Sequence, residues 1–215
     1  MAKSSRMIGV SLGARTTAEA EAALREIAHV ADIAEIRLDF MEEFDLPRLL
    51  AHRPCPVIVT YRPEREGGRY RGSEEERARV LRQAIALGAD YVDVEHDAVH
   101  LIPNRRQTKL IVSFHDFQQT PANFVAIHRD LAAKGADIVK IVGMAQDVRD
   151  NLLVFDALAQ ATLPTIAIAM GEAGLPSRIL ALRYDSCFLT YATLGRGERV
   201  APGQLPIATM REVYR

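Results

Sequence analysis

A lysine lies in the middle of an otherwise apolar run, Ile138-Val139-Lys140-Ile141-Val142. Burying an ammonium group costs several kcal/mol unless the group is paired or loses its proton. A buried lysine that has lost its proton is a nucleophile, and it attacks ketones to form an imine, or Schiff base. We therefore expect Lys140 to mark a reaction centre. A structural ion pair is the alternative for a lone buried lysine.

Two other runs carry a carboxylate at the place that Lys140 occupies. Residues 31–36, 89–94 and 136–141 align without a gap, each beginning with Ala-Asp and carrying one charge three places after that Asp. The charged residues are Glu35, Asp93 and Lys140. This internal repeat predicts that the three side chains face one another. The neighbouring Arg37 and Arg62 would favour a neutral lysine and the two carboxylates a charged one, a balance that the sequence leaves open.

A histidine and an arginine end two further apolar runs. Residues 57–62 align with residues 110–115, so Arg62 and His115 are expected at equivalent points of the structure. Beside an imine-forming lysine, His115 is suited to proton transfer. Without such a lysine nearby, His115 could equally have no functional role. We expect the other histidines on the surface: His29, His52, His96, His100 and His128.

Two loops carry further candidates. The first, residues 62–68, ends in two glycines that let the backbone turn sharply and offer Glu66 to the site, whereas Glu64 and Arg65 are interpreted as solvated charges. The second, residues 195–204, has glycines near both ends. It is expected to be either a mobile lid or a disordered connection.

Eight short β-favouring runs alternate with helical patterns and would position these residues. They are residues 7–11, 33–38, 57–61, 91–94, 110–114, 138–142, 165–169 and 188–191. Near-continuous apolar strands are typical of a parallel sheet covered by helices, so the pattern predicts an α/β protein, a (β/α)8 TIM barrel, as one domain over residues 1–215. Alternate strands of such a barrel supply one interior layer, which would bring Lys140 to the two carboxylates. A doubly wound open sheet is the alternative, but no Gly-rich phosphate loop follows the first run.

Capping signals predict where the helices begin and end. Thr16-x-x-Glu19 and Ser73-x-x-Glu76 are capping boxes, and the helix after Ser73 is expected to stop at Gly88. Further helices are expected to start at Thr120-Pro121, near Asp147 and at Leu175-Pro176, the first of them stopping at Gly135.

Composition narrows the range of partners. The chain has 215 residues, of which 48% are apolar, and a net charge of -1 with both signs mixed along its length. We therefore expect no nucleic acid and no membrane as a partner, and a small polar metabolite is compatible. No apolar run approaches the ~20 residues of a membrane span, and residues 1–6 are too short and polar for a secretion signal, so a cytoplasmic protein is expected.

The sequence suggests neither a metal site nor a redox role. Cys55 and Cys187 lie far apart without a CxxC or metal-ligand spacing, so we expect two reduced, buried thiols rather than a disulfide. The histidines form no zinc-ligand motif, and metal-dependent catalysis is therefore disfavoured.

Seven motifs occur in the order and spacing of a known family. They are Glu35-Ile36-Arg37-Leu38-Asp39, Arg62 through Glu66-Gly67-Gly68, Ser113-Phe114-His115-Asp116-Phe117, Lys140-Ile141, Met170-Gly171, Ser177-Arg178 and Ala201-Pro202-Gly203-Gln204. With them the chain resembles type I 3-dehydroquinate dehydratase over nearly its whole length. The resemblance implies a (β/α)8 barrel that dehydrates 3-dehydroquinate to 3-dehydroshikimate in the shikimate pathway of aromatic amino-acid biosynthesis. It also implies a homodimer that needs no metal or cofactor.

The resemblance implies roles for single residues. Lys140 is similar to the Schiff-base lysine, His115 to the general acid and base, and Glu66 to the carboxylate that assists the histidine. The positions that resemble substrate-binding residues are Ser11, Glu35, Arg37, Arg62, Arg178 and Gln204. Two departures bear on loop closure and affinity: Val200 stands where the family usually has a serine, and the chain ends soon after the eighth run.

Two other functions fit some of these residues. A Schiff-base aldolase also uses a strand lysine in a barrel, but it commonly needs a phosphate site after the seventh and eighth strands. Residues 195–204 carry an acidic residue and a proline among their glycines, which makes a poor phosphate cradle. An inactive barrel that binds a metabolite or a partner domain is the third interpretation. Val200 favours it, and the intact lysine, histidine and carboxylate argue against it.

Overall fold

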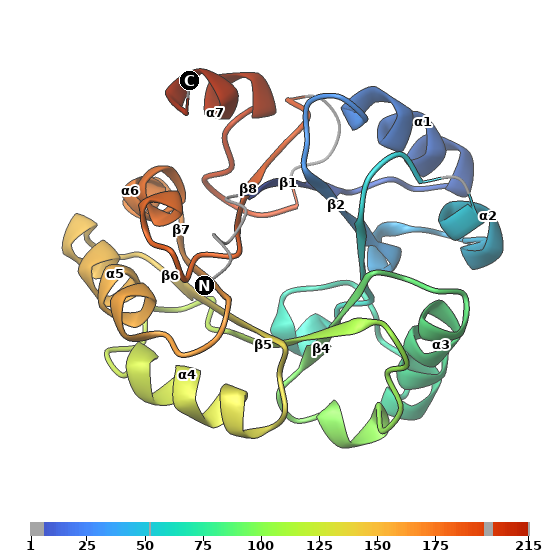
Figure 1. Cartoon of the computed structure of the whole chain (residues 1–215), viewed down its shortest axis with the longest axis horizontal. Coiled ribbons are helices and arrows are strands. Elements are labelled where there is room, and N and C mark those ends of the chain that lie inside the picture. The colour runs from blue at the N-terminus through green and yellow to red at the C-terminus, as the bar shows by residue number, and fades with distance from the viewer. Residues whose placement is uncertain (1–6, 52, 196–199, 215) are drawn as a thin grey trace.

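The eight predicted strands form one parallel sheet that curls into a barrel in the computed structural model (Figure 1). The structure describes residues 7–51, 53–195 and 200–214. The strands are β1 Met7–Leu12, β2 Ile33–Arg37, β3 Val57–Thr60, β4 Tyr91–Glu95, β5 Lys109–His115, β6 Ile138–Met144, β7 Thr165–Met170 and β8 Leu189–Ala192. They are hydrogen-bonded in the order β7-β6-β5-β4-β3-β2-β1-β8. Each strand therefore lies beside its neighbours in the sequence.

The barrel closes between β7 and β8 through a short contact rather than a full ladder. Thr165 donates its backbone N–H to the carbonyl oxygen of Ser186 and accepts the N–H of Phe188, both at 2.8 Å. This nearly closed ring of eight parallel strands confirms the predicted TIM-barrel fold, and the doubly wound open sheet is wrong. Closure brings the carboxyl ends of all the strands to one rim.

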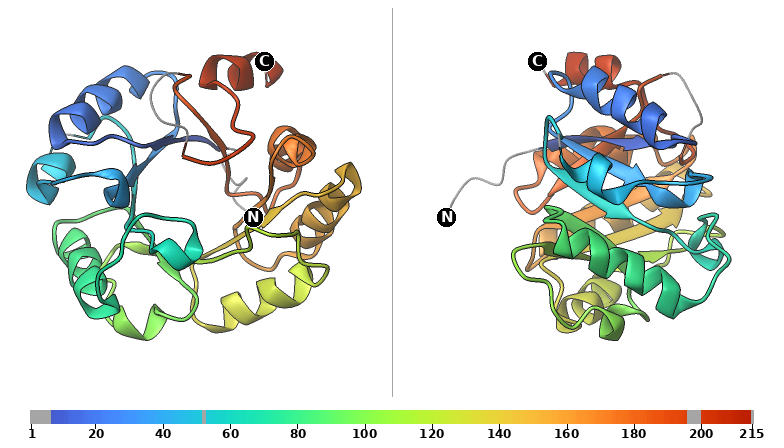
Figure 2. Two further views of the ribbon diagram at one scale, coloured as in Figure 1. Left: turned by 180° about the vertical axis from the view of Figure 1, so that it is seen from behind. Right: turned by 90° about the vertical axis from the view of Figure 1, so that its right-hand side faces the viewer.

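Helices surround the strands (Figure 2). They are α1 Thr17–Ile27, α2 Leu46–Ala51, α3 Glu74–Ala86, α4 Phe124–Ala133, α5 Asn151–Gln160, α6 Leu175–Leu180 and α7 Ile207–Val213, with short 3-10 turns η1 Leu38–Phe40, η2 Glu64–Glu66, η3 Val99–Leu101, η4 Val148–Asp150 and η5 Ala181–Arg183. The connection from β4 to β5 is fully described and holds only η3. Strand and helix therefore do not alternate throughout, because Pro103 and Asn104 stand where a helix would run.

The capping boxes are formed to different degrees. At α3, Ser73 Oγ accepts the N–H of Glu76 and the Ser73 N–H donates to the Glu76 carboxylate, both at 3.3 Å, so this box is complete. At α1, Thr16 Oγ1 accepts the N–H of Glu19 at 3.2 Å. The Glu19 carboxylate, however, accepts the N–H of Arg15 at 2.8 Å instead of closing the box on Thr16. The predicted α1 start is confirmed, and only half of its box exists.

Two of the three remaining helix starts are confirmed and one is wrong. Asp147 caps η4, which leads into α5, and α6 begins at Leu175 with a proline in its first turn. The helix expected at Thr120-Pro121 begins only at Phe124. Thr120 instead lies against β6, where a Cβ added to Gly143 would stand 2.8 Å from the Thr120 Cα atom. The chain therefore crosses the end of β6 before it turns helical.

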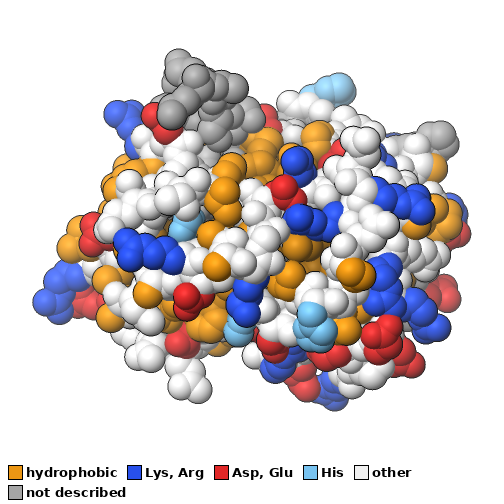
Figure 3. All heavy atoms as spheres, turned by 60° about the horizontal axis from the view of Figure 1, so that its bottom comes forward, with side chains coloured by type: hydrophobic (Ala, Val, Ile, Leu, Met, Phe, Trp, Pro, Cys, Tyr) orange, Lys and Arg blue, Asp and Glu red, His pale blue; other side chains and the backbone are white. Residues whose placement is uncertain are grey.

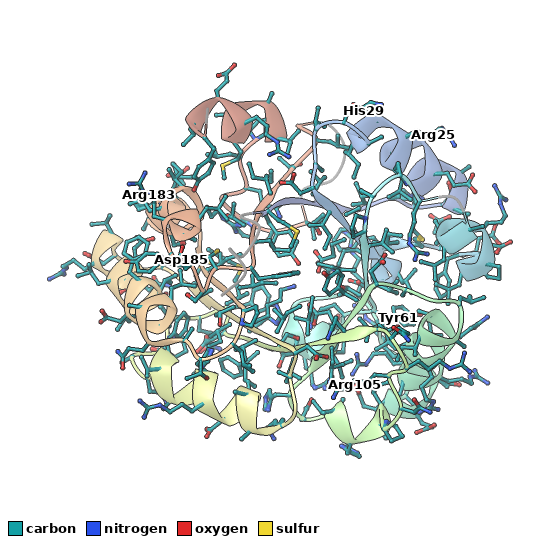
Figure 4. The ribbon with its side chains drawn as sticks, viewed as in Figure 1. Arg25, His29, Tyr61, Arg105, Arg183 and Asp185 are labelled. Carbon is teal, nitrogen blue, oxygen red and sulfur yellow. The ribbon has the colours of Figure 1, made fainter. Side chains whose placement is uncertain are left out.

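The Ala-Asp of the internal repeat has a structural task at the opposite end of the strands from the charges. The carboxylates of Asp32, Asp90 and Asp137 accept the backbone N–H of Ile8, Val57 and Leu110, at 2.7, 3.0 and 2.9 Å. Each also pairs at 3.0 Å with an arginine: Arg211, Arg53 and Arg105 respectively, the last of which is labelled in Figure 4. The repeat therefore ties each even strand to the odd strand before it.

Apolar side chains pack both between strands and helices and inside the ring, where side chains fill the interior (Figure 4). His128 was expected on the surface, but it is buried on the inner face of α4, with Nε2 3.0 Å from Thr165 Oγ1. That expectation is wrong because His128 follows the buried Phe124 by one helical turn. His52 lies outside the described residues. Cys187 is a buried free thiol as expected, whereas the free thiol of Cys55 is only half-buried.

The surface carries charges of both signs between scattered apolar side chains on the face shown in Figure 3. Within the part of the chain that the structure describes, no helix has the length and apolar character needed to cross a membrane.

Candidate active site

Lys140 projects from the middle of β6 to two carboxylates inside the barrel. Its Nζ lies 2.7 Å from Asp93 Oδ2 on β4 and 3.1 Å from Glu35 Oε1 on β2. The internal repeat predicts this meeting of alternate strands. The ion pair that was the alternative interpretation therefore exists. The same nitrogen nevertheless faces a cavity at the carboxyl end of the barrel, so it is accessible to a small ligand.

Asp93 is a fixed, buried anion. Its carboxylate also lies 2.6 Å from Arg62 Nη2 and accepts the hydroxyl of Ser113 at 2.6 Å. Burial alone would raise the pKa of Asp93, but the charges of Arg62 and Lys140 outweigh it and hold the pKa well below 3.8. Asp93 is therefore ionised at neutral pH.

Glu35 is the second anion at the lysine, and it reaches the cavity. It accepts hydrogen bonds from Ser11 Oγ at 2.5 Å and from Thr60 Oγ1 at 2.9 Å. Burial acts to raise the pKa of Glu35, and the charges of Lys140 and Arg37 reverse the sign and lower it below 4.5. The Ser11 hydroxyl is thus engaged in a hydrogen bond to Glu35, although Ser11 also lines the cavity.

Arg62 is paired with two buried protein carboxylates. Its Nη1 lies 2.5 Å from Glu95 Oε1 and 2.8 Å from Ser113 Oγ, in addition to the contact of Nη2 with Asp93. Behind it, Arg77 of α3 reaches through the sheet and places Nη1 2.5 Å from Glu95 Oε2. Arg77 is 1% exposed. A ladder of buried ion pairs therefore runs from an outer helix to Lys140.

His115 and Glu66 form a hydrogen-bonded pair at the rim. Glu66 Oε2 accepts the backbone N–H of His115 and lies 2.9 Å from His115 Nδ1. Burial raises the pKa of Glu66 from 4.5 to about 7, although Arg62 opposes the change. Burial, together with the charges of Arg62 and Lys140, lowers the pKa of His115 well below 6.5. The imidazole is therefore neutral, and a ring that donates from Nδ1 to Glu66 keeps Nε2 as a base.

A phenyl ring covers this pair. Phe117 stacks on His115 with ring centroids 6.1 Å apart and planes 15° from parallel. Gly67 makes room for it, because a Cβ at Gly67 would lie 2.0 Å from Phe117 Cζ, and the glycine also has φ 73°. The two glycines were predicted to shape a turn. Gly67 does so, and the ring of Phe117 packs against it.

Arg37 and Arg178 differ in their pairing. Arg37 makes a two-point ion pair with Asp39, with N–O distances of 2.8 and 2.7 Å. Arg178 is 1% exposed, and its only printed polar contact among the described residues is a 2.8 Å donation to the carbonyl oxygen of Pro202. Burial lowers the pKa of Arg178 to about 10. Arg178 Nε and Gln204 Oε1 are buried without a hydrogen-bond partner among the described residues, and both residues line one cavity, so the cavity has unsatisfied capacity for a polar ligand.

One cavity joins all nine candidate residues. They are Ser11, Glu35, Arg37, Arg62, Glu66, His115, Lys140, Arg178 and Gln204, joined by Gly67, Phe117, Val142, Ile168, Met170, Tyr191, Val200 and Ala201. A larger cavity of about 550 Å³ lies beside it between α1 and the end of β8, and shares Ser11. Among the described residues, the larger cavity is lined by Glu19 and Glu26 but by no basic side chain or histidine, so the smaller cavity is the candidate site.

Sequence reasoning missed three residues of this centre. Tyr191 is the fourth member of the Lys140 layer and could have been found by extending the repeat to the eighth strand. Arg77 could have been noticed as a charge on the buried face of a helix, in line with Leu81. Phe117 gave no signal beyond its place in the motif around His115. Residues 196–199 of the expected lid lie outside the described part of the chain.

The described residues bring together no group of three or more His, Cys, Asp or Glu side chains that could hold a metal ion. What they do bring together around one small cavity is a lysine amine, a histidine with its carboxylate, and an arginine without a carboxylate partner among them. This set is suited to covalent catalysis on an anionic ketone.

Comparison with known proteins gives a consistent result. A family model described as type I 3-dehydroquinase matches residues 8–215. A 3-dehydroquinate dehydratase from Desulfotalea psychrophila is 35% identical over 223 residues, which cover 98% of this chain and 97% of that protein. A bifunctional 3-dehydroquinate dehydratase/shikimate dehydrogenase from Arabidopsis thaliana is 40% identical over 196 residues, covering 86% of this chain but only 32% of the plant protein.

A solved structure is similar over the same range. It is the type I 3-dehydroquinate dehydratase of Clostridium difficile with covalently modified comenic acid, with a TM-score of 0.85 and 25% sequence identity. The match covers 97% of this chain and 90% of that one.

Proposed function

This chain belongs to the type I 3-dehydroquinase family, and we propose that it dehydrates 3-dehydroquinate to 3-dehydroshikimate through a Schiff base on Lys140. One observation carries the mechanism: Lys140 lines the same cavity as the His115–Glu66 pair and Arg178, whose guanidinium has no carboxylate partner among the described residues. The Clostridium difficile relative contains covalently modified comenic acid, which supports a covalent route. Family membership favours dehydration over the aldolase alternative.

The substrate is held by its charge. We assign its carboxylate to Arg178, because this buried guanidinium has no carboxylate partner among the described residues and a planar donor suits a carboxylate. Gln204 lines the same cavity and offers a substrate hydroxyl a side-chain carbonyl oxygen that has no partner among the described residues. Arg37 and Arg62 are already paired with protein carboxylates, so they act mainly by positioning those anions and by their field.

Lys140 attacks the ketone after it gives up a proton. Neutral His115 is the base in reach of the cavity, since the two carboxylates at Lys140 are held ionised. Nζ adds to the carbonyl carbon to form a carbinolamine, which loses water to give a protonated imine. Glu35 and Asp93 then stabilise that positive nitrogen, as they stabilise the ammonium in the free protein. The chemistry therefore does not require the lysine to be uncharged in the free protein, a point that the sequence left open.

His115 performs the two proton transfers that follow imine formation. The protonated imine withdraws electrons from the adjacent carbon, so Nε2 of His115 can remove a proton there and leave an enamine. The enamine expels the hydroxyl on the next carbon, and the imidazolium returns its proton to that oxygen, which leaves as water. Glu66 stabilises the imidazolium between the two transfers. Hydrolysis of the product imine frees Lys140.

The pathway, the location in the cell and the oligomeric state are proposed from family membership. We propose a place in the shikimate pathway of aromatic amino-acid biosynthesis, a cytoplasmic location and assembly as a homodimer. Val200 reaches the cavity in place of the family's serine, so substrate affinity rests more heavily on Arg178 and Gln204.

Borohydride trapping tests this proposal. The protein is incubated with 3-dehydroquinate and borohydride, and the added mass is mapped by peptide mass spectrometry. We expect it on Lys140, none in Lys140→Ala, and slow turnover with retained labelling in His115→Ala. Lys109→Ala, which changes an exposed lysine of β5, is the matched control and should label fully. Labelling that survives in Lys140→Ala would refute the mechanism.

A further inference from the structure

The fourth even-numbered strand, β8, contributes a tyrosine to the layer that holds Lys140. Tyr191 is 4% exposed, and its Oη lies 3.5 Å from Lys140 Nζ. The ammonium also stands over the ring, 5.0 Å from its centroid. Layers of four side chains from alternate strands are typical of TIM barrels. Here the layer consists of two anions, the nucleophile and a phenol.

We propose that Tyr191 is a further catalytic residue, whose hydroxyl donates a hydrogen bond to the oxygen of the carbinolamine formed at Lys140. The inference rests on the proposed Schiff-base function and adds to it a residue that assists both formation and hydrolysis of the imine.

The distances allow this contact. In a carbinolamine, nitrogen and oxygen are bonded to the same carbon at lengths near ~1.4–1.5 Å, so they lie about 2.4 Å apart. A hydroxyl oxygen 3.5 Å from the nitrogen is therefore within reach of the carbinolamine oxygen at about 2.7–2.8 Å. Tyr191 lines the same cavity as Lys140, so the ketone enters between them.

Tyr191 acts as a donor and not as a proton source. Burial, reinforced by the charges of Glu35 and Asp93, raises the pKa of Tyr191 well above 10. Loss of its proton beside two carboxylates would place a third anion in the layer. A phenol has one O–H to donate and lone pairs to accept, so it can accept from the Lys140 ammonium and redirect its O–H once that nitrogen is bonded to carbon.

The assisted step balances without a further reagent. The C–O bond of the carbinolamine breaks, its oxygen takes a proton from the His115 imidazolium and leaves as water, and the nitrogen lone pair forms the C=N bond. Tyr191 keeps its own proton and hydrogen-bonds to the departing oxygen. In the reverse direction, the same hydroxyl orients the water that hydrolyses the product imine.

A packing role is the competing explanation for this ring. Tyr191 belongs to the apolar cluster inside the barrel, and a Cβ added to Gly9 would stand 3.6 Å from its Cδ1. Tyr191→Phe separates the two roles, because it retains the ring and removes only the oxygen. Tyr91→Phe is the matched control, since Tyr91 also packs inside the barrel, on β4 against Phe188, but does not line the cavity.

Two rates measure the step. The first is the rate at which rapid mixing with 3-dehydroquinate and quenching with borohydride yields the labelled protein. The second is the exchange of the ketone oxygen of unreacted 3-dehydroquinate in ¹⁸O-water, which requires the carbinolamine oxygen to leave. We expect both to fall about tenfold in Tyr191→Phe, the size of one hydrogen bond to a leaving group, with an unchanged melting temperature. Tyr91→Phe should match the wild type.

The outcomes separate this inference from the proposed function. Equal rates in Tyr191→Phe and the wild type would overturn the role of the hydroxyl while leaving the Schiff base intact. An equal fall in Tyr91→Phe would also overturn it, because any interior hydroxyl would then suffice. Absence of any trapped adduct in the wild type would remove the proposed function itself, and that result is visible without the variants.

Discussion

Replacing Glu66 by glutamine should stabilise the folded protein at alkaline pH and slow its chemistry. Glu66 is held in a buried position beside His115, where its pKa rises from 4.5 to about 7 because burial disfavours the carboxylate. At about 1.4 kcal/mol per pKa unit, this rise corresponds to about 3 kcal/mol of unfolding free energy. The site thus keeps a carboxylate at a cost in stability.

The size of the stability difference between the variant and the wild type depends on pH. A raised acid pKa means that the folded protein binds the proton more tightly than the unfolded chain does. The resulting stability is fully present below pH 4.5 and is lost as the pH rises through about 7. Glutamine does not titrate, so Glu66→Gln avoids this loss. Its stability relative to the wild type should rise by most of about 3 kcal/mol between pH 5 and pH 8.5.

Urea unfolding of both proteins at pH 5, 7 and 8.5 measures this difference. His115 also changes charge in the acid part of the range, and comparison at each pH removes that shared contribution. Glu64→Gln is the control, because Glu64 belongs to the same turn, η2, but pairs with Arg71 at the exposed surface. It should stay within about 0.5 kcal/mol of the wild type at every pH.

The same variant should lose activity, because no carboxylate then stabilises the imidazolium of His115. We expect kcat to fall by about 10–100-fold while borohydride labelling of Lys140 is retained. A stability difference that does not change between pH 5 and pH 8.5 would refute the account of Glu66 as a buried, strained carboxylate.

Two further predictions concern residues around the site. Arg77→Met should lower the unfolding free energy by about 3–5 kcal/mol, because it leaves Glu95 Oε2 buried without its cation, and denaturant unfolding against the exposed control Arg79→Met measures it. A loss below about 1 kcal/mol would show that the ion-pair ladder is dispensable. Gly67→Ala should cost about 1–3 kcal/mol and lower kcat, because φ 73° and the ring of Phe117 both exclude a Cβ. In the double variant with Phe117→Ala, only the part of the lost unfolding free energy that is due to the clash with the ring should be recovered. Full recovery would show that the positive φ at residue 67 contributes no backbone strain.

Local patterns predicted the strands and most of the helix boundaries. Strands such as Val57–Thr60 are short, continuous apolar runs, and Ser73 and Gly88 mark the two ends of α3 by well-understood backbone requirements. The α4 start failed because the packing of Thr120 against Gly143, which is distant in sequence, prevails over the preference for proline in a first turn.

The candidate site was partly predictable for a different reason. The internal repeat placed Glu35, Asp93 and Lys140 at one register, and barrel symmetry then made them neighbours. The same symmetry extends to Tyr191, but a tyrosine in an apolar strand resembles any core residue until its oxygen is found beside the lysine. The pairing of Glu95 with both Arg62 and Arg77 could not be foreseen, since it joins three separate elements.

The sequence by itself determined which groups exist and at what spacing: one lysine in an apolar strand, carboxylates in the same register, and a histidine at a strand end. Those features follow from periodicities that act over a few residues. Tertiary structure alone decided the charge of each group, because charge depends on burial and on partners from other strands. Closure of the ring set His115 against Glu66 and left Arg178 without a carboxylate partner among the described residues, and the proposed preference of the cavity for an anionic ketone rests on these two facts.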